Sequence, residues 1–169
     1  IGSSGSTGLE SNYLEYFMAD IINKVNGEYN EINLKKTLWN SKALSADVND
    51  AINPMFKEVH DSLNAAKLGY GIVVTKYTGS GGKYSSNDAD AEFVHEIRTL
   101  LNKNNITWQI GMLGKVDEGG GGTVAKYLAN FGIRTIDVGP ALLAMHSPFE
   151  LASKFDIYET YISYKVFYK

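Results

Sequence analysis

Cysteine is absent from this chain of 169 residues. Its absence excludes a disulfide-stabilised scaffold, a cysteine-ligated metal site and thiol catalysis, and it fits the reducing cytoplasm, where we expect the protein to reside. A strong excess of either charge is also absent, because the net charge is -3 at pH 7. We therefore expect no nucleic-acid partner and no anionic-membrane partner, since both require a basic surface.

Long apolar runs are missing as well. No run approaches the roughly 18 residues of a membrane-spanning helix, and no signal peptide is visible. Hydrophobic residues nevertheless make up 44% of the sequence and aromatic residues 12%, which is enough for a sizeable core. The length fits one domain or a large part of one. Because the first residue is Ile1 rather than Met, we expect the natural protein to begin further upstream.

The spacing of apolar residues predicts helices and strands that alternate along the chain. A stripe with a period of four predicts a first helix, which ends at Asn26-Gly27 and carries Leu9, Tyr13, Phe17, Ile21 and Val25. The predicted elements that follow are a strand at 70–77, a flexible loop at 78–82, a helix around 93–101 capped by Asn87 or Asp88, a strand at 107–113, a helix around 124–131 closed by Gly132, and a strand at 133–138. This alternation predicts an α/β fold with a central, mostly parallel sheet between two helical layers.

The last segment, residues 147–169, has two interpretations. Tyr158, Ile162 and Val166 fit one face of a helix, whereas the apolar residues between 160 and 168 also alternate as in a strand. We favour a helix that begins at a Ser147-Pro148 cap, because Glu150 completes a capping box with Ser147. The aromatic residues of this tail exceed what one helix face buries, so part of the tail should pack on another half of the protein or on another subunit.

Two polar residues, Asp47 and His146, follow apolar segments that lie far apart in the sequence. One carboxylate and one imidazole are suitable zinc ligands when cysteine is absent. A single His beside an apolar run is more often a hydrogen-bonded structural residue. The chemistry of the two side chains alone therefore does not decide between a metal site and a structural role.

The surrounding strings carry a family resemblance. They are Ile1-Gly2-Ser3 through Gly8, Leu44-Ser45-Ala46-Asp47, Asn53-Pro54, Gly119-Gly120-Gly121-Gly122-Thr123 and Met145-His146-Ser147-Pro148. In this order they resemble the C-terminal half of the aspartyl-aminopeptidase and aminopeptidase I family, which comprises dinuclear zinc exopeptidases. The resemblance implies a three-layer α-β-α fold of the zinc-exopeptidase (phosphorylase/hydrolase-like) type. It also implies that residues 1–169 are the C-terminal portion of the catalytic domain, without its first part and without the inserted oligomerisation domain.

The resemblance further implies a metal site. Asp47 would bind one zinc ion and His146 the other, with manganese or cobalt as alternatives, and two metals about 3.5–4 Å apart activate a water and polarise the carbonyl. The family's general-base Glu and a further ligand Glu usually stand directly before the Ile-Gly-Ser string, upstream of Ile1. We therefore expect no catalytic residue within this chain, and we expect the chain alone to be inactive.

The same resemblance gives candidate substrate-binding residues, which are Asp50, Lys76, Tyr84, Gly121, Gly122 and Thr123. The glycines have a second interpretation as a tight strand-to-helix turn, and Lys76 and Tyr84 as a surface Lys and a packed Tyr. Asp50 stands where relatives specific for acidic residues carry a His, which weakens the case for an Asp- or Glu-preferring enzyme. His60 could reach the site, but we favour a structural role for it.

The expected function is that of a zinc-dependent aminopeptidase that removes N-terminal residues from peptides. The expected partners are a peptide substrate, the missing N-terminal half and further copies in a homo-oligomer, which the resemblance implies to be a dodecamer. One alternative is a non-catalytic interaction or regulatory domain with a peptidase-like fold. A nucleotide-binding domain is disfavoured, because the glycine loop before Lys83 is followed by Tyr84 and not by the Ser or Thr of a phosphate loop.

Overall fold

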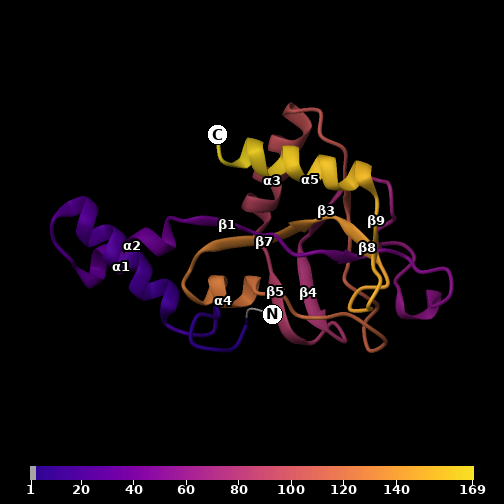
Figure 1. The fold of residues 1–169 in the computed structure, drawn as a ribbon, viewed down its shortest axis with the longest axis horizontal. Coiled ribbons are helices and arrows are strands. Elements are labelled where there is room, and N and C mark those ends of the chain that lie inside the picture. Colours follow the sequence, from indigo (N-terminus) through magenta and orange to yellow (C-terminus); the bar gives the residue numbers. More distant parts are fainter. Residues whose placement is uncertain (1–2) are drawn as a thin grey trace.

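The computed structural model describes residues 3–169 (Figure 1). Ile1 and Gly2, which begin the first matching string, lie outside the described residues. The helices are α1 (Tyr13–Asn26), α2 (Glu31–Trp39), the 3-10 turn η1 (Lys57–Val59), α3 (Ala91–Lys103), α4 (Ala125–Asn130) and α5 (Lys154–Phe167). The strands are β1 (Lys42–Ser45), β2 (Asn49–Asp50), β3 (Ile72–Thr75), β4 (Tyr77–Ser80), β5 (Tyr84–Asp88), β6 (Trp108–Ile110), β7 (Arg134–Gly139), β8 (Ala141–Leu143) and β9 (Leu151–Ala152).

The central sheet has four strands in the order β1-β7-β3-β6. β1 runs parallel to β7 and β3 runs parallel to β6, whereas β3 and β7 are antiparallel. β3 is buried along its whole length, as expected for a β-branched segment covered on both faces. The predicted α/β class with a mostly parallel central sheet is thus confirmed.

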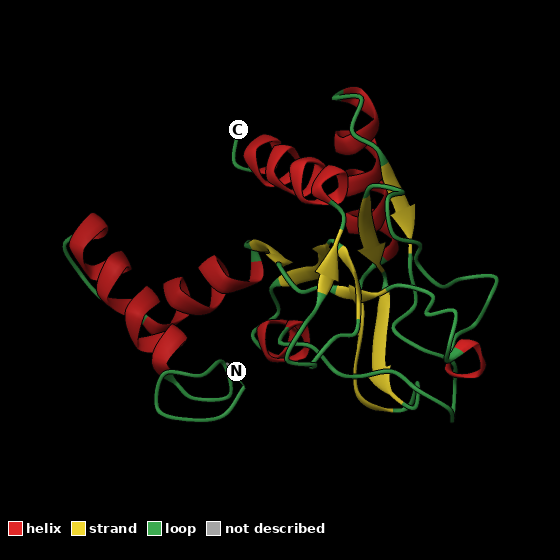
Figure 2. Ribbon diagram, turned by 45° about the vertical axis from the view of Figure 1, so that its right-hand side comes forward, coloured by secondary structure: helices red, strands yellow, loops and turns green. Residues whose placement is uncertain are grey.

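Helices α3 and α5 cover one face of this sheet, and α4 lies on the other side (Figures 1 and 2). The main core forms between the first face and α3, where Phe93, Ile97 and Leu101 meet Ile72 and Ile136. The cap of α3 was predicted wrongly. Asp90 accepts the Phe93 N–H at 2.8 Å, while Asn87 and Asp88 belong to β5.

The predicted loop at 78–82 is instead part of a β-hairpin. Strands β4 and β5 pair antiparallel, with Ser80 opposite Tyr84 and an irregular register between Thr78 and Ser80. The glycines at the tip lie in the left-handed region, with φ 57° at Gly81 and 68° at Gly82, which is the turn chemistry that closes a hairpin. The density of glycine in this stretch therefore reflects a tight turn rather than a flexible loop.

Helices α1 and α2 form a helical pair that projects from one edge of the central sheet (Figure 2). α1 ends at Gly27 with φ 76°, as predicted. Its core contact differs from what the predicted stripe suggests, because Ile22, with Leu14 and Met18, packs against Leu34 and Leu38 of α2. The stripe of period four points outward, and Tyr13, Phe17, Ile21 and Val25 are 38–77% exposed. α1 is thus apolar on two faces, and one of them has no covering element among residues 3–169.

The tail is a helix, as favoured, but it begins later than predicted. Ser153 caps α5, and β9 pairs with β8 before it, so the chain between Ser147 and Ala152 is not helical. The buried face of α5 is polar. Asp156 accepts the backbone N–H groups of Gly69 at 2.7 Å and Gly71 at 2.8 Å, and Glu159 accepts that of Thr107 at 2.8 Å. These carboxylates tie α5 to the loops that precede β3 and β6.

No helix in the described part of the chain is long and apolar enough to cross a membrane.

Candidate functional site

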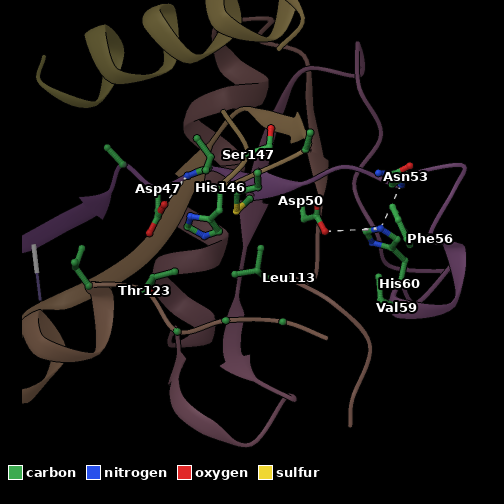
Figure 3. A pocket seen from close by; sticks show the side chains of 18 of the residues that line it. Asp47, Asp50, Asn53, Phe56, Val59, His60, Leu113, Thr123, His146 and Ser147 are labelled. Atoms are coloured by element: carbon green, nitrogen blue, oxygen red, sulfur yellow. Dashed lines mark hydrogen bonds and ion pairs between the residues drawn. The ribbon is translucent and has the colours of Figure 1, made fainter. Parts of the chain in front are cut away.

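A cleft of about 1180 Å³ opens where the central sheet meets the small sheet of β2, β8 and β9 (Figure 3). Its walls come from segments that are distant in the sequence. The lining residues are Ser3, 46–48, Asp50, Asn53, Phe56, Val59, His60, Leu113, 120–124 and 144–147. Both predicted metal ligands and four of the six predicted substrate-binding residues, Asp50, Gly121, Gly122 and Thr123, are in this set.

Asp47 lies where the chain passes from the central sheet to the small sheet. Ser45 is opposite Asp137 in the pairing of β1 with β7, and Asn49 is opposite Ala141 in the pairing of β2 with β8. The two segments therefore run together through both sheets, and Asp47 occupies the interruption between the ladders. Gly139 is required here, because a Cβ atom on it would lie 1.9 Å from the Asp47 carbonyl oxygen. The Asp47 carboxylate accepts the Val48 N–H at 2.9 Å.

His146 reaches the cleft from the turn that joins β8 to β9. Its φ is 68° and that of Ala144 is 58°, so two non-glycine residues of this turn adopt the left-handed conformation. The His146 N–H donates to the Glu150 carboxylate at 2.6 Å, and the Ser147 hydroxyl donates to the Phe149 carbonyl at 2.6 Å. Local strain of this kind is found where a functional side chain must be held in one direction.

The side chains of Asp47 and His146 point into the same end of the cleft (Figure 3). Carboxylate oxygen and imidazole nitrogen are donors that zinc accepts, so the two residues fit part of a zinc site. Within residues 3–169, no group of three or more His, Cys, Asp or Glu side chains is arranged to hold a metal ion. The described residues alone therefore do not make up a metal site.

A buried carboxylate that the sequence did not single out lies behind this end of the cleft. Asp137 on β7 is 3% exposed and accepts the Thr123 hydroxyl at 3.0 Å through Oδ2. Its Oδ1 has no hydrogen-bond partner among the residues that the structure describes. Burial raises the pKa of Asp137 to about 6, and the charge of Asp47 adds to the increase. Asp137 therefore anchors Thr123, a residue of the cleft wall, at an electrostatic cost.

The glycine segment forms the wall that ends at Thr123, and its members differ. A Cβ atom on Gly120 would lie 2.4 Å from the Leu113 carbonyl oxygen, and one on Gly122 would lie 2.6 Å from that of Ser85. Tight packing therefore explains these two glycines. At Gly121 the nearest atom to such a Cβ would be Leu113 Cδ2 at 3.6 Å, so the chain itself leaves room for a side chain there.

The opposite end of the cleft contains Asp50 and His60, which extend toward each other in Figure 3. Asp50 Oδ2 is 3.7 Å from His60 Nε2, and the side chains are 32% and 2% exposed, respectively. His60 Nε2 accepts the Asn53 N–H at 3.3 Å. Burial raises the pKa of Asp50, and the nearby His60 partly opposes that increase. His60, for which we favoured a structural role, is both a hydrogen-bonded buried residue and part of the cleft wall.

Lys76 and Tyr84 do not line this cleft. Lys76 is exposed and forms an ion pair with Asp88, and Tyr84 is 73% exposed at the start of β5. Their assignment as substrate-binding residues has no support from the position of either side chain.

Some cleft residues carried no signal in the sequence. Phe56 and Val59 belong to a segment without periodicity, Leu113 ends the predicted strand at 107–113, of which only Trp108–Ile110 forms β6, and Asp137 falls inside an otherwise apolar strand pattern. A carboxylate in the middle of an otherwise apolar strand is itself unusual, and that mismatch could have identified Asp137.

The family model described as aminopeptidase I zinc metalloprotease (M18) matches residues 1–168. A probable M18 family aminopeptidase 1 of Borrelia garinii subsp. bavariensis is 65% identical over 170 residues, which cover 100% of this chain and 37% of the relative. The chain thus spans little more than a third of the length of the curated relatives that it matches.

Solved structures agree with this match. The crystal structure of an M18 family aminopeptidase from Thermotoga maritima superposes with a TM-score of 0.92 at 49% identity, covering 98% of this chain and 37% of that one. A protein from S. cerevisiae that is described as a dodecamer shares the fold, with a TM-score of 0.73 at 24% identity over 99% of this chain and 35% of that one. The sequence motifs, the cleft and these matches agree, and the chain belongs to the M18 family of aminopeptidase I zinc metalloproteases.

Proposed function

We propose that the complete protein is a zinc-dependent aminopeptidase that removes N-terminal residues from peptides and that its active site lies in the cleft described above. One observation carries the proposal. Asp47 and His146, from segments far apart in the sequence, line the same cleft with their side chains directed into one end. Bound there, zinc supplies a Lewis acid for the scissile carbonyl and an activated water for its hydrolysis.

The proposal requires groups beyond residues 3–169, because the described residues hold no complete ligand set. We place the remaining ligands of a two-metal site and the general base in other parts of the complete protein. In this arrangement Asp47 and His146 contribute one ligand each, and the chain of 169 residues is inactive by itself. Manganese or cobalt could replace zinc with the same oxygen and nitrogen donors.

The wall from Gly120 to Thr123 would bind the main chain of the peptide. Gly121 has open space where a side chain would stand, so a substrate can approach its backbone closely. The Thr123 hydroxyl is held by Asp137, which fixes the end of this wall relative to β7. Substrate orientation by a rigid wall of this kind contributes to rate because it lowers the entropy that is lost on reaching the reactive geometry.

We further propose that the complete protein forms a homo-oligomer. Support comes from two apolar surfaces that no other part of residues 3–169 covers. One is the outer face of α1, and the other is the outer face of α5, where Phe155, Ile157, Tyr158 and Tyr161 are 44–58% exposed. Apolar surface of this extent is typical of interaction sites. Light scattering of the complete protein would test this part, and a monomer would contradict it.

The central test uses the complete protein with His146→Ala and a matched control, His95→Ala. His95 is an exposed residue of α3 outside the cleft. The His146 variant should lose most bound zinc, measured by mass spectrometry of the metal, and most hydrolysis of leucyl-7-amido-4-methylcoumarin. The His95 variant should retain both. Unchanged zinc content and activity in the His146 variant would overturn the assignment.

A further inference from the structure

The end of the cleft that lies away from Asp47 and His146 has the composition of a side-chain pocket. Phe56 and Val59 give it apolar walls, Leu113 lies between this end and His146, and Asp50 supplies a carboxylate between Leu113 and Phe56 (Figure 3). A side chain that enters this end must therefore match both an aliphatic surface and a negative charge. Long basic side chains have this character, because an aliphatic stem carries the charge at its tip.

The hydrogen bonding of His60 leaves the Asp50 charge available. His60 Nε2 accepts the Asn53 N–H, so the lone pair of this nitrogen is occupied by a backbone donor. Nδ1 is buried and has no hydrogen-bond partner among the described residues. At 3.7 Å, Asp50 Oδ2 and His60 Nε2 are too far apart for a hydrogen bond. His60 therefore lines the pocket without a hydrogen bond to the Asp50 carboxylate.

Within residues 3–169, no Lys or Arg side chain forms an ion pair with Asp50, and the ionisable side chain beside it is that of His60. The carboxylate is 32% exposed, so a ligand can reach it. Burial disfavours its charge and raises its pKa. A cation that enters the pocket would replace lost hydration with a charge-assisted hydrogen bond.

We propose that Asp50 is a specificity-determining residue that selects peptides with an N-terminal Lys or Arg, binding the ammonium or guanidinium group of that side chain. The inference rests on the proposed aminopeptidase function and deepens it by naming the substrate class. Asp50 lies three residues beyond Asp47, in β2 of the small sheet. It therefore lines the cleft at a distance from the end where the peptide bond would be cleaved. This position suits a side chain better than the α-amine, which must stay beside the scissile bond.

The experiment compares lysyl and norleucyl 7-amido-4-methylcoumarin as substrates of the zinc-loaded complete protein. The two side chains share the four-carbon stem, and only the lysyl side chain carries an ammonium group. The ratio of their kcat/KM values should be roughly 10 or more, as expected for one hydrogen bond to a charged group. Asp50→Asn should bring the ratio to about 1 by lowering kcat/KM for the lysyl substrate alone, whereas Asp50→Glu should preserve a preference for it.

Asp88→Asn is the matched control, because Asp88 is a carboxylate outside the cleft that pairs with Lys76. It should leave the ratio unchanged. A wild-type ratio near 1 would overturn the inference even if the Asp50 variants failed to fold. An equal loss for both substrates in Asp50→Asn would assign Asp50 to the α-amine and would also overturn it.

The proposed function can fail separately. If no aminoacyl substrate were hydrolysed, that function would be refuted. Calorimetric titration of the protein with L-lysinamide and L-norleucinamide would then test the basic side-chain specificity of the pocket without catalysis. Tighter binding of lysinamide that Asp50→Asn abolishes would support the pocket. Equal binding of the two amides would overturn it.

Discussion

Asp47 and His146 reach the same cleft by different structural routes. Asp47 stands between two β-ladders, and the backbone beside it packs so closely against β7–β8 that only glycine fits opposite. His146 stands in an exposed turn with φ 68°, and its N–H is held by the carboxylate of Glu150, the last residue of the same turn. One proposed ligand is thus fixed by the fold and the other by a local contact. Substitutions beside Asp47 should therefore destabilise the whole protein, whereas substitutions beside His146 should affect the cleft alone.

The largest effect is expected for Gly139→Ala. The added Cβ would meet the Asp47 carbonyl oxygen at 1.9 Å, so the ladders must separate, and we expect a loss of more than about 3 kcal/mol of stability or no soluble protein. Thermal unfolding measures the effect. Gly27→Ala is the control, because its φ is 76° and a Cβ there would meet no other atom, so backbone strain of about 1 kcal/mol is its whole cost. Equal effects of the two variants would show that the Asp47 side is not tightly packed.

Asp137→Asn tests how much the buried charge behind Asp47 costs in stability. The folded-state pKa of about 6 lies above the ordinary 3.8, so ionisation of Asp137 opposes folding, and this penalty appears as the pH rises from about 4 to above 6. Asn keeps an acceptor for Thr123 and removes the charge. The zinc-free variant should gain up to about 3 kcal/mol at neutral pH and nothing below pH 4, measured by urea unfolding across this range. If the free energy of unfolding changed with pH in the same way in wild type and variant, the raised pKa of Asp137 would be contradicted.

On the His146 side, Glu150→Ala removes the carboxylate that holds the His146 N–H. We expect zinc affinity of the complete protein to fall roughly 10-fold, as for other groups that orient a ligand, with little change in the unfolding temperature of the zinc-free protein. Competition with a fluorescent chelator measures the affinity. Glu10→Ala is a control, because Glu10 is an exposed carboxylate outside the cleft. A large loss of stability without a loss of affinity would place His146 in the same class as Asp47.

The smallest effect is expected for Tyr164→Phe. The Tyr164 hydroxyl donates to the Val138 carbonyl at 2.5 Å, which ties α5 to β7 beside Gly139. Burial raises the pKa of Tyr164 to about 12, so the hydroxyl remains protonated as a donor. Its loss should cost about 1 kcal/mol of stability by urea unfolding. The exposed Tyr161→Phe should cost nothing measurable, and a larger loss there would indicate that the outer face of α5 is covered.

The sequence was sufficient for the parts of the fold that local apolar patterns determine. The class, the strand around Ile133–Val138 and the end of α1 at Gly27 were predicted correctly, because burial and turn chemistry act there through neighbouring residues. The stripe of α1 was predicted but its outward direction was not, since periodicity shows that a face is apolar but not what covers it. The buried face of α5 was missed because Asp156 and Glu159 are buried by backbone N–H groups from distant loops.

The candidate site, too, was predicted where local motifs determine it and missed where contacts between distant segments do. Motif strings indicated Asp47, His146 and the glycine wall, and all of them line the cleft. The pairing of Asp50 with His60 and the support of Thr123 by Asp137 depend on contacts between segments that no local pattern connects. Lys76 and Tyr84 were placed by analogy across a glycine turn. Lys76 precedes the β4–β5 hairpin, Tyr84 begins its second strand, and neither side chain lines the cleft.

The interruption of the two ladders at Asp47 also has a consequence for the order of assembly. β1 and β7 are separated by about half of the chain, so Asp47 takes its position only after a non-local pairing that closes a long loop. A slip of one residue in that pairing would turn the alternating side chains to opposite faces and direct Asp47 away from the cleft. Correct register is therefore required for metal binding. A metal ion that binds Asp47 and His146 together would stabilise only the correctly folded chain.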